Sequence, residues 1–230
     1  MEKHIELVLW ILGAYLVGGV PFGFLIGKMR GVDVRTVGSK NIGATNVFRT
    51  VGKKWGLLAF ACDFLKGFLP TLAAKIYAAK SGDATLAAYL PLAVGVMCVV
   101  GHMFTCFMNF KGGKGIATGF GMLVALMPLL VLAAFALFIV VVRTFHYISL
   151  GSICAAAFLL VAVWFPCGAL SNPDGFRNMP QCVIVALVAA FAIWKHRTNI
   201  SRLLAGNENR FYWNKPKAPA AEPTSGKEGV

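Results

Sequence analysis

Long apolar segments separated by short polar ones occupy most of the 230-residue chain. A helix crosses the hydrocarbon core of a bilayer with about 20 predominantly apolar residues. Apolar segments of about this length or shorter recur along the chain, at Ile5–Gly27, Trp55–Ala79, Thr85–Phe110, Ile116–Val142, Ile148–Phe165 and Cys182–Trp194. The pattern predicts an all-α integral membrane protein with a single transmembrane domain at residues 1–213. A Pro-, Ala- and Lys-rich tail at residues 214–230 is predicted to be disordered.

A proline divides the fourth of these segments. Met127-Pro128 lies at the midpoint of Ile116–Val142, and proline breaks or kinks a helix interior. If the basic loops on both sides face the cytoplasm, the chain must cross the membrane an even number of times between them. We therefore predict two short helices here, giving about seven transmembrane helices, with the N-terminus outside and the C-terminus in the cytoplasm. Each half would be only about 20 Å long, so a re-entrant hairpin is the alternative.

The composition agrees with a membrane protein and limits the other classes. Hydrophobic residues make up 58% of the chain and charged residues 13%, which excludes a soluble domain of this size. The formal net charge of +13 comes from 22 Lys and Arg against 9 Asp and Glu. Because these basic residues lie in short loops between apolar segments, the positive-inside distribution explains them without nucleic acid. The expected partner is the lipid bilayer, and a monomer is compatible with the sequence, which leaves the oligomeric state open.

The cysteines do not indicate a metal site. None of the six lies in a CxxC or Cys/His pattern, and four lie inside apolar segments as small buried residues. Cys167 and Cys182 flank one loop and would form a disulfide if that loop faces an oxidising compartment. We expect neither a metal nor a cofactor.

The first polar island is Gly38–Arg49, with the sequence GSKNIGATNVFR. Ser39, Asn41, Asn46 and Arg49 supply hydroxyl, amide and guanidinium groups within one short loop. Arginine binds phosphate in a bidentate manner. A solvated loop that only sets the topology is the alternative, but it would not need this density of polar groups. These four residues are predicted to bind an anionic substrate.

The second island is Lys111–Gly115, with the sequence KGGKG, directly before the apolar pattern that starts at Ile116. Backbone amides in a glycine-rich turn at a helix start can bind phosphate oxygens. Gly112, Gly113 and Gly115 would supply the turn, and Lys111 and Lys114 would neutralise the anion. An ordinary glycine-rich turn between two helices is the alternative.

The third island is His196–Arg210, with the sequence HRTNISRLLAGNENR. His196, Asn199 and Arg202 recur at three-residue spacing and would share one face of a helix. That face would either point into a site or serve as an ordinary interfacial anchor. Ser149 is a further candidate, because it lies beside the basic break at Arg143–His146.

Asp63, Lys66 and His102 are ionisable residues that fall inside apolar segments. Asp63 and Lys66 are an i,i+3 pair, and charged groups in a membrane are costly unless they are paired or functional. We expect a structural ion pair rather than a catalytic one. His102 would either brace the glycine loop or pack as a hydrogen-bonded residue.

The chemistry is limited by what the motifs lack. No island contains a Ser-His-Asp or Cys-His arrangement identifiable from sequence, and neither the HxxxxD motif nor a carboxylate-rich metal-binding pattern is present. A reaction that uses a preactivated donor therefore fits better than one that needs a covalent nucleophile.

Four stretches together resemble the bacterial acyl-phosphate:glycerol-3-phosphate acyltransferases of the PlsY type. They are GSKNIGATNVFRTVGKKWG, CDFLKGFLP, GHMFTCFMNFKGGKGIATGFG and HRTNISRLLAGNENR. The resemblance implies acyl transfer from acyl phosphate to the sn-1 hydroxyl of glycerol 3-phosphate, which yields lysophosphatidic acid and phosphate in phospholipid synthesis. It also implies seven helices in the bacterial cytoplasmic (inner) membrane, with the active site at the cytoplasmic face.

The resemblance also implies roles for individual residues. The loop Lys111–Gly115 would cradle the donor phosphate, and His196, Asn199 and Ser149 would be catalytic. The hydroxyl proton would go either to His196 or to a phosphate oxygen of the substrate. Two other functions use the same features: a transporter for a phosphorylated solute, and an assembly partner of another lipid enzyme.

Overall fold

The structure, a computed structural model, describes residues 2–164 and 179–212, which are helical apart from short connections. The helices in chain order are α1 (Glu2–Gly19), α2 (Phe22–Met29), α3 (Ala44–Thr50), α4 (Lys53–Ser81), α5 (Ala84–Met103), the 3₁₀ turn η1 (Cys106–Met108), α6 (Ile116–Leu126), α7 (Pro128–Phe145), α8 (Ile148–Ala162), α10 (Met179–Lys195) and α11 (Arg197–Leu204). The predicted tail at 214–230 and Cys167 of the predicted disulfide lie outside the described residues.

The all-helical membrane class is confirmed, but length alone identifies fewer spans than the sequence predicted. Four helical stretches are long and apolar enough to cross a bilayer, at His4–Met29, Lys53–Ser81, Ala84–Met108 and Pro128–Phe145. The bent pair α10 and α11 raises the number to five if it is one span. The helices α6 and α8 are apolar but have only 11 and 15 residues, below the length of a full crossing.

The structure confirms the break at Met127-Pro128 and corrects two predicted boundaries. Met127 has φ −145° and ψ 70°, outside the helical region, and Pro128 begins α7, where its missing N–H costs nothing. The predicted segment Ile5–Gly27 is divided between α1 and α2 at Val20-Pro21, because Pro21 cannot donate a helical hydrogen bond. The predicted segment Thr85–Phe110 leaves the α-helical path after Met103.

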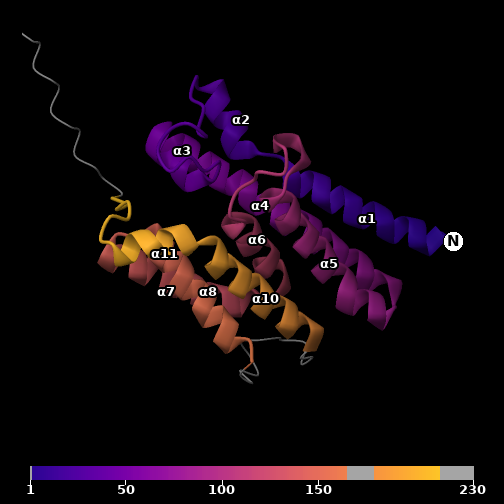
Figure 1. Cartoon of the computed structure of the whole chain (residues 1–230). Helices are drawn as coiled ribbons and strands as arrows, with labels where there is room; N and C mark the ends of the chain where they lie inside the picture. The colour runs from indigo at the N-terminus through magenta and orange to yellow at the C-terminus, as the bar shows by residue number, and fades with distance from the viewer. Residues whose placement is uncertain (1, 165–178, 213–230) are drawn as a thin grey trace, which may run out of the picture.

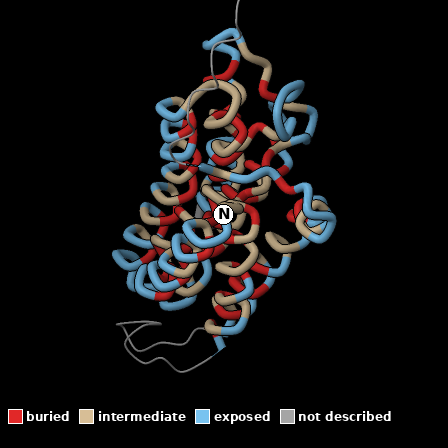
Figure 2. The backbone as a smooth tube through the Cα atoms, turned by 90° about the vertical axis from the view of Figure 1, so that its left-hand side faces the viewer, coloured by how far each residue is buried: buried red, intermediate tan, exposed pale blue. Residues whose placement is uncertain are grey.

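The helices form two groups with α6 between them. The helices α1, α4 and α5 pack against one another, α8 packs against α7 and α10, and α6 lies against α4, α5 and α7 (Figure 1). Buried residues face the interior of the bundle (Figure 2). The outward side chains of the long helices are apolar, for example Leu9 at 64% exposure and Leu187 at 60%, as expected for a surface that faces lipid.

Glycines bring α6 close to α4. A Cβ on Gly67 would lie 2.1 Å from the carbonyl oxygen of Thr118, and one on Gly121 would lie 2.1 Å from that of Phe64. Small residues allow membrane helices to approach at backbone distance. This contact places the start of α6, and the KGGKG loop before it, against the middle of α4.

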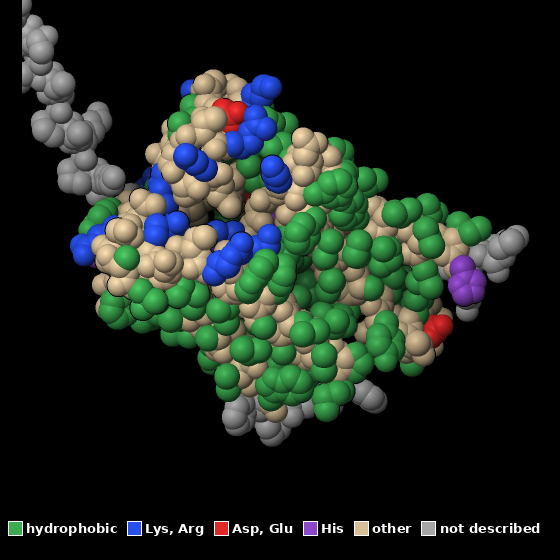
Figure 3. Space-filling view, in the orientation of Figure 1, with side chains coloured by type: hydrophobic (Ala, Val, Ile, Leu, Met, Phe, Trp, Pro, Cys, Tyr) green, Lys and Arg blue, Asp and Glu red, His purple; other side chains and the backbone are tan. Residues whose placement is uncertain are grey.

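Polar and apolar ends of the bundle are separate. In Figure 1, α2, α3 and α11 lie at the upper left and the N-terminus at the right. In Figure 3, Lys and Arg side chains gather over the first of these ends.

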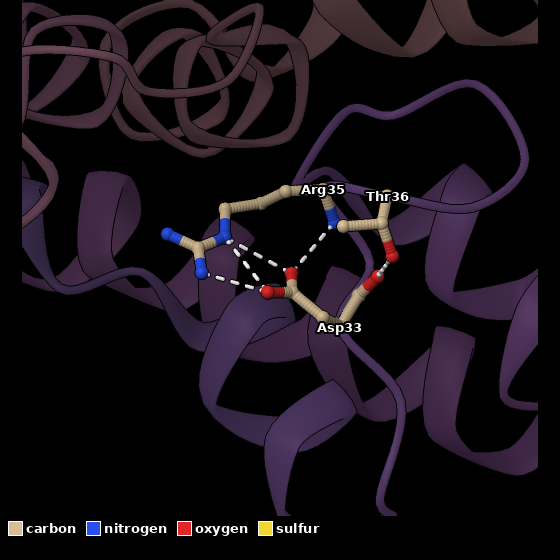
Figure 4. Close-up of polar contacts among 3 residues, drawn as sticks. All are labelled: Asp33, Arg35 and Thr36. Atoms are coloured by element: carbon tan, nitrogen blue, oxygen red, sulfur yellow. Dashed lines mark hydrogen bonds and ion pairs between the residues drawn. The ribbon is translucent and has the colours of Figure 1, made fainter.

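The connection from α2 to α3 contains Asp33, which accepts hydrogen bonds from the Arg35 side chain at 2.7 to 3.2 Å (Figure 4). These bonds lower the pKa of Asp33 to about 2, so the carboxylate stays charged.

Candidate active site

The first island is shaped by its own asparagines. The Asn46 side chain is 1% exposed and donates to the carbonyl oxygens of Val34 (2.8 Å) and Val37 (3.1 Å), while its Oδ1 accepts from the Ser39 amide (2.9 Å). Asn41 Oδ1 accepts from the Gly43 amide at 2.8 Å. The structure therefore uses Asn46 and Asn41 to fold the loop, and it leaves Ser39 exposed at the surface.

Arg49 is the residue of this island that reaches a second one. It lies on α3 and is half-buried, and its Nη2 donates to the carbonyl oxygen of Asn209 at 3.2 Å. Burial and the nearby Arg202 cation lower the pKa of Arg49, whereas the Glu208 carboxylate raises it.

The glycines of the second island pack on α5. The amides of Gly112 and Gly113 donate to the carbonyl oxygens of Met103 (3.1 Å) and His102 (3.0 Å). A Cβ on Gly112 would lie 2.0 Å from the His102 carbonyl oxygen. Both amides are therefore used to join the loop to the end of α5 and do not point to a ligand. The part of the island that is left as a candidate for the predicted phosphate nest is its end, at Lys114 and the start of α6.

The two lysines of the island differ in environment. Lys111 is exposed, while Lys114 is half-buried and its Nζ donates to Asn199 Oδ1 of the third island. Gly115 adopts φ +79°, a left-handed conformation that glycine tolerates, and α6 begins at the next residue.

Glu208 holds the third island together, and sequence reasoning missed it. Its Oε1 accepts from Asn199 Nδ2 (2.7 Å) and from Ser149 Oγ (2.9 Å), and its Oε2 accepts from Arg202 Nε (2.6 Å). Burial would raise the pKa of Glu208, but these three hydrogen bonds outweigh it and lower the pKa. One signal was present: Glu208 is the single acidic residue in the basic stretch His196–Arg210.

The chain after α11 folds back over the site. The Phe211 amide donates to the His146 carbonyl oxygen at 2.6 Å, and the Phe211 ring lies 5.0 Å from that of Phe48. This path carries Glu208 and Asn209 past α8 and α3. Residues from all three islands, together with Ser149, therefore meet at one place.

Positive charge dominates this place. Arg49, Lys114 and Arg202 surround the single carboxylate of Glu208. Burial, together with Arg202 and Arg49, lowers the pKa of Lys114 to about 8, although Glu208 opposes this shift. An anion bound among these cations would relieve their repulsion, so the site is suited to a phosphate group.

His196 lies at the bend between α10 and α11 and is 4% exposed. Its Nδ1 is 2.8 Å from the Ala192 carbonyl oxygen. A carbonyl can only accept, so Nδ1 carries the hydrogen and Nε2 keeps a lone pair. Burial and the Lys114 cation lower the pKa of His196 to about 4, so the ring is neutral at pH 7.

The described residues contain no group of three or more His, Cys, Asp or Glu side chains that could hold a metal ion. Apart from the Glu208 carboxylate and the neutral His196 ring, the polar groups of the site are ones that can donate: two guanidinium groups, an ammonium, a hydroxyl and an amide. Fold and site together define a multi-pass membrane protein with a buried, cationic site for phosphate-bearing molecules.

Comparison with known proteins identifies the family. Residues 8–206 match the family model described as glycerol-3-phosphate acyltransferase. The glycerol-3-phosphate acyltransferase of Trichlorobacter lovleyi is 48% identical over 204 residues, covering 88% of this chain and 96% of the relative. That of Geobacter sulfurreducens is 45% identical over 209 residues, covering 90% and 97%.

Solved structures agree with this result. The crystal structure of PlsY, an integral membrane glycerol 3-phosphate acyltransferase, in its glycerol 3-phosphate form has a TM-score of 0.74 and 38% identity, covering 90% of this chain and 96% of that one. Its lysophosphatidic acid form gives 0.72 and 37%, with the same coverage. The chain belongs to the glycerol-3-phosphate acyltransferase family of the PlsY type, which confirms the predicted resemblance and the predicted enzyme of phospholipid synthesis. Of the three functions considered, the acyltransferase is the one that holds.

The pKa of Lys114 gives a pH-dependent prediction. Because this pKa is lowered to about 8, Lys114 is charged below pH 8 and loses its charge as the pH rises through that value. We expect kcat/KM for the acyl donor to fall above about pH 8. In Lys114→Arg the guanidinium stays charged, so the fall should move to higher pH. Initial rates measured from pH 6 to 10 for both proteins test this. An identical decrease of kcat/KM at high pH in both proteins would contradict it.

Proposed function

We propose that the acyl donor is acyl phosphate and that the chain transfers its acyl group to the sn-1 hydroxyl of glycerol 3-phosphate at the convergence of the three islands. The supporting observation is that cations from segments far apart in sequence, Arg49, Lys114 and Arg202, surround one place. Two anionic headgroups repel each other, and fixed cations offset that repulsion while holding both within reacting distance.

The donor chemistry explains why no covalent nucleophile is needed. Acyl phosphate is a mixed anhydride, and its leaving group is phosphate. The acceptor oxygen attacks the acyl carbon, the bond to the phosphate oxygen breaks, and inorganic phosphate leaves with that electron pair. The protein then has to orient the reactants and stabilise negative charge, which donors and cations can do.

The site suggests a division of roles. Lys114 and the amides at the start of α6 would hold the donor phosphate, while Arg49, Arg202 and the exposed Ser39 and Lys111 would bind the phosphate of glycerol 3-phosphate. Asn199 and Ser149 would orient the reacting groups by hydrogen bonds. Asn41, Asn46, Gly112, Gly113 and Gly115 would contribute by shaping the two loops.

We assign the hydroxyl proton to a phosphate oxygen of the substrate rather than to His196. With a pKa of about 4, His196 is a weak base, and a carbonyl rather than a carboxylate orients it. His196 Nε2 would then accept a hydrogen bond from the hydroxyl and position it.

His196→Ala tests this assignment. A general base supplies a factor of about 100 to 10,000 in rate, so we expect kcat to fall by less than about 100-fold. The dependence of kcat on pH between pH 5 and 8 should be unchanged. Rates measured against pH with both substrates saturating provide the comparison. A larger loss of kcat, accompanied by the disappearance of an acidic limb, would make His196 the base.

We further place the active site at the cytoplasmic face of the bacterial inner membrane, with seven crossings and the N-terminus outside. The support is the basic character of the end that holds α2, α3 and α11, opposite the N-terminus (Figures 1 and 3). Lys54→Cys and Ala84→Cys, each in a cysteine-free background, form a matched pair of exposed positions. In intact cells an impermeant maleimide should label Ala84→Cys and spare Lys54→Cys, and the reverse pattern would exclude this topology.

A donor comparison tests the reaction itself. Purified protein in detergent receives labelled glycerol 3-phosphate with palmitoyl phosphate, palmitoyl-CoA or palmitoyl-acyl-carrier protein. Only palmitoyl phosphate should give lysophosphatidic acid, with one phosphate released per product. Product from palmitoyl-CoA alone would leave the family assignment intact and refute acyl phosphate as the donor.

A further inference from the structure

An ionisable cluster lies inside the helix bundle and takes no part in the mechanism above. Lys66 Nζ is 2.7 Å from Asp63 Oδ1, which confirms the predicted ion pair on α4. His102 Nδ1 on α5 is 3.6 Å from the same oxygen. The three side chains are 2%, 3% and 5% exposed, in the order Lys66, Asp63 and His102. Charged groups held this deeply in a membrane protein are costly, and those that persist are usually paired and functional.

One end of the cluster joins the break between α1 and α2. Lys66 Nζ donates to the carbonyl oxygen of Val20 at 2.7 Å. Pro21 follows Val20 and ends α1, so carbonyl groups here have lost their helical donors. The neighbouring Gly19 carbonyl oxygen accepts instead from Thr105 Oγ1 at 2.6 Å, just beyond the end of α5.

The other end of the cluster joins the glycine loop. The His102 carbonyl oxygen accepts from the Gly113 amide at 3.0 Å, and a Cβ on Gly113 would lie 2.1 Å from His102 Nε2. The imidazole ring therefore lies directly against the backbone of Gly113. The next residue is Lys114, whose ammonium meets Asn199 in the active site. Of the two roles expected for His102, this contact favours bracing the glycine loop.

These contacts form one continuous path. Asp63 Oδ1 lies 3.6 Å from Nδ1 of His102, which is a close approach but too long for a hydrogen bond. Lys66 holds Asp63 while it is itself held by the Val20 carbonyl oxygen. The orientation of the His102 ring would determine where the backbone of Gly113 can lie. The position of that backbone would in turn determine where the side chain of Lys114 points.

We propose that Asp63, Lys66 and His102 are positioning residues that hold the Lys111–Gly115 loop in place and so fix the Lys114 ammonium relative to Arg49 and Glu208. They do not touch the substrate. This inference rests on the role proposed for Lys114. The competing explanation is that the cluster only joins α4 to α5, and in that case its loss would affect stability alone.

The test compares two buried positions on the same helix. His102→Asn keeps a donor near Asp63 but removes the part of the ring that lies against Gly113. Val94→Ala is the matched control, because Val94 is completely buried on α5 in a cluster remote from the loop. For each variant, Tm in detergent, kcat, KM for the donor palmitoyl phosphate and the pH limb near 8 are measured at saturating glycerol 3-phosphate.

The two variants should separate stability from positioning. We expect His102→Asn to raise KM for palmitoyl phosphate by about tenfold to a hundredfold, the effect of a misplacement of about 1 Å, and to shift the pH limb. Val94→Ala should lower Tm while KM and the limb stay as in the wild type. The proposal would be overturned if the two variants have equal KM values and the same decrease of the rate near pH 8, with only Tm lowered.

The ion pair is tested by its neutral form. Asp63→Asn or Lys66→Met alone leaves a buried charge unpaired, so either single variant is expected to fold poorly. The double variant Asp63→Asn/Lys66→Met has no unpaired charge, and it should fold but show the same raised KM as His102→Asn. A double variant with wild-type KM would refute a positioning role for the pair. Wild-type turnover in the same assay, and a loss in Lys114→Ala, separate this result from a failure of the proposed donor or of the proposed role of Lys114.

Discussion

Replacing Lys114 with alanine should reduce kcat/KM for acyl transfer to glycerol 3-phosphate by about 100- to 1,000-fold. Lys114 is half-buried among Arg49, Arg202 and Glu208, and it donates to Asn199. In such an environment a fixed cation or donor that meets developing negative charge is worth about 3–4 kcal/mol in the transition state. The measurement is the initial rate of lysophosphatidic acid formation with varied palmitoyl phosphate at saturating glycerol 3-phosphate.

Lys111 is the matched control, because it belongs to the same loop and is exposed. An exposed charge is screened by water, so Lys111→Ala should reduce the rate by about tenfold or less. The two variants divide the duties of the two lysines, which the sequence alone could not do. Equal losses in both would falsify the assignment of the donor phosphate to Lys114.

Replacing Glu208 with alanine should destabilise the folded protein by about 3 kcal/mol and abolish activity. Its carboxylate accepts from Ser149, Asn199 and Arg202, so its removal leaves two buried donors and one cation unpaired. Breaking a buried pair costs about 3–5 kcal/mol, and the lower end applies because the Arg202 side chain is 36% exposed. For a domain of this size the loss corresponds to about 6–12 °C in Tm.

Two further variants separate charge from shape in this prediction. Glu208→Gln keeps the length of the side chain and one acceptor oxygen, so it should retain part of the stability but not the full rate. Asn207→Ala changes an exposed neighbour in the same segment and should behave as the wild type. A Glu208→Ala protein with unchanged Tm would mean that the hydrogen bonds around this carboxylate do not hold α8 and α11 together.

The elements of the fold were largely predictable because their signals are local. A run of apolar residues needs no distant partner to become a helix in lipid, where its backbone groups must be satisfied within the segment. The same reasoning located the break at Met127-Pro128, since the missing N–H of proline acts within one turn. It missed the break at Pro21, because residues 5–27 form one continuous apolar run in the sequence.

The function was predictable for a different reason. The three polar islands are short stretches whose residue types and order resemble one family, and the comparisons with known proteins confirm that resemblance. The roles of individual residues did not follow as well. Asn46 looked suited to bind an anion, and the structure uses both ends of its amide to fold the loop.

The sequence by itself determined the membrane helices, the basic end of the molecule, the family and the three polar islands, because each is carried by neighbouring residues. Only the tertiary structure decided that Gly112 and Gly113 serve close packing on α5, that Lys114 faces Asn199, and that Glu208 joins Ser149 to Arg202. The physical reason is clearest for the two long-range contacts: Lys114 and Asn199 are 85 positions apart, and Ser149 and Glu208 are 59 positions apart. No local pattern encodes which donor meets which acceptor across a folded bundle.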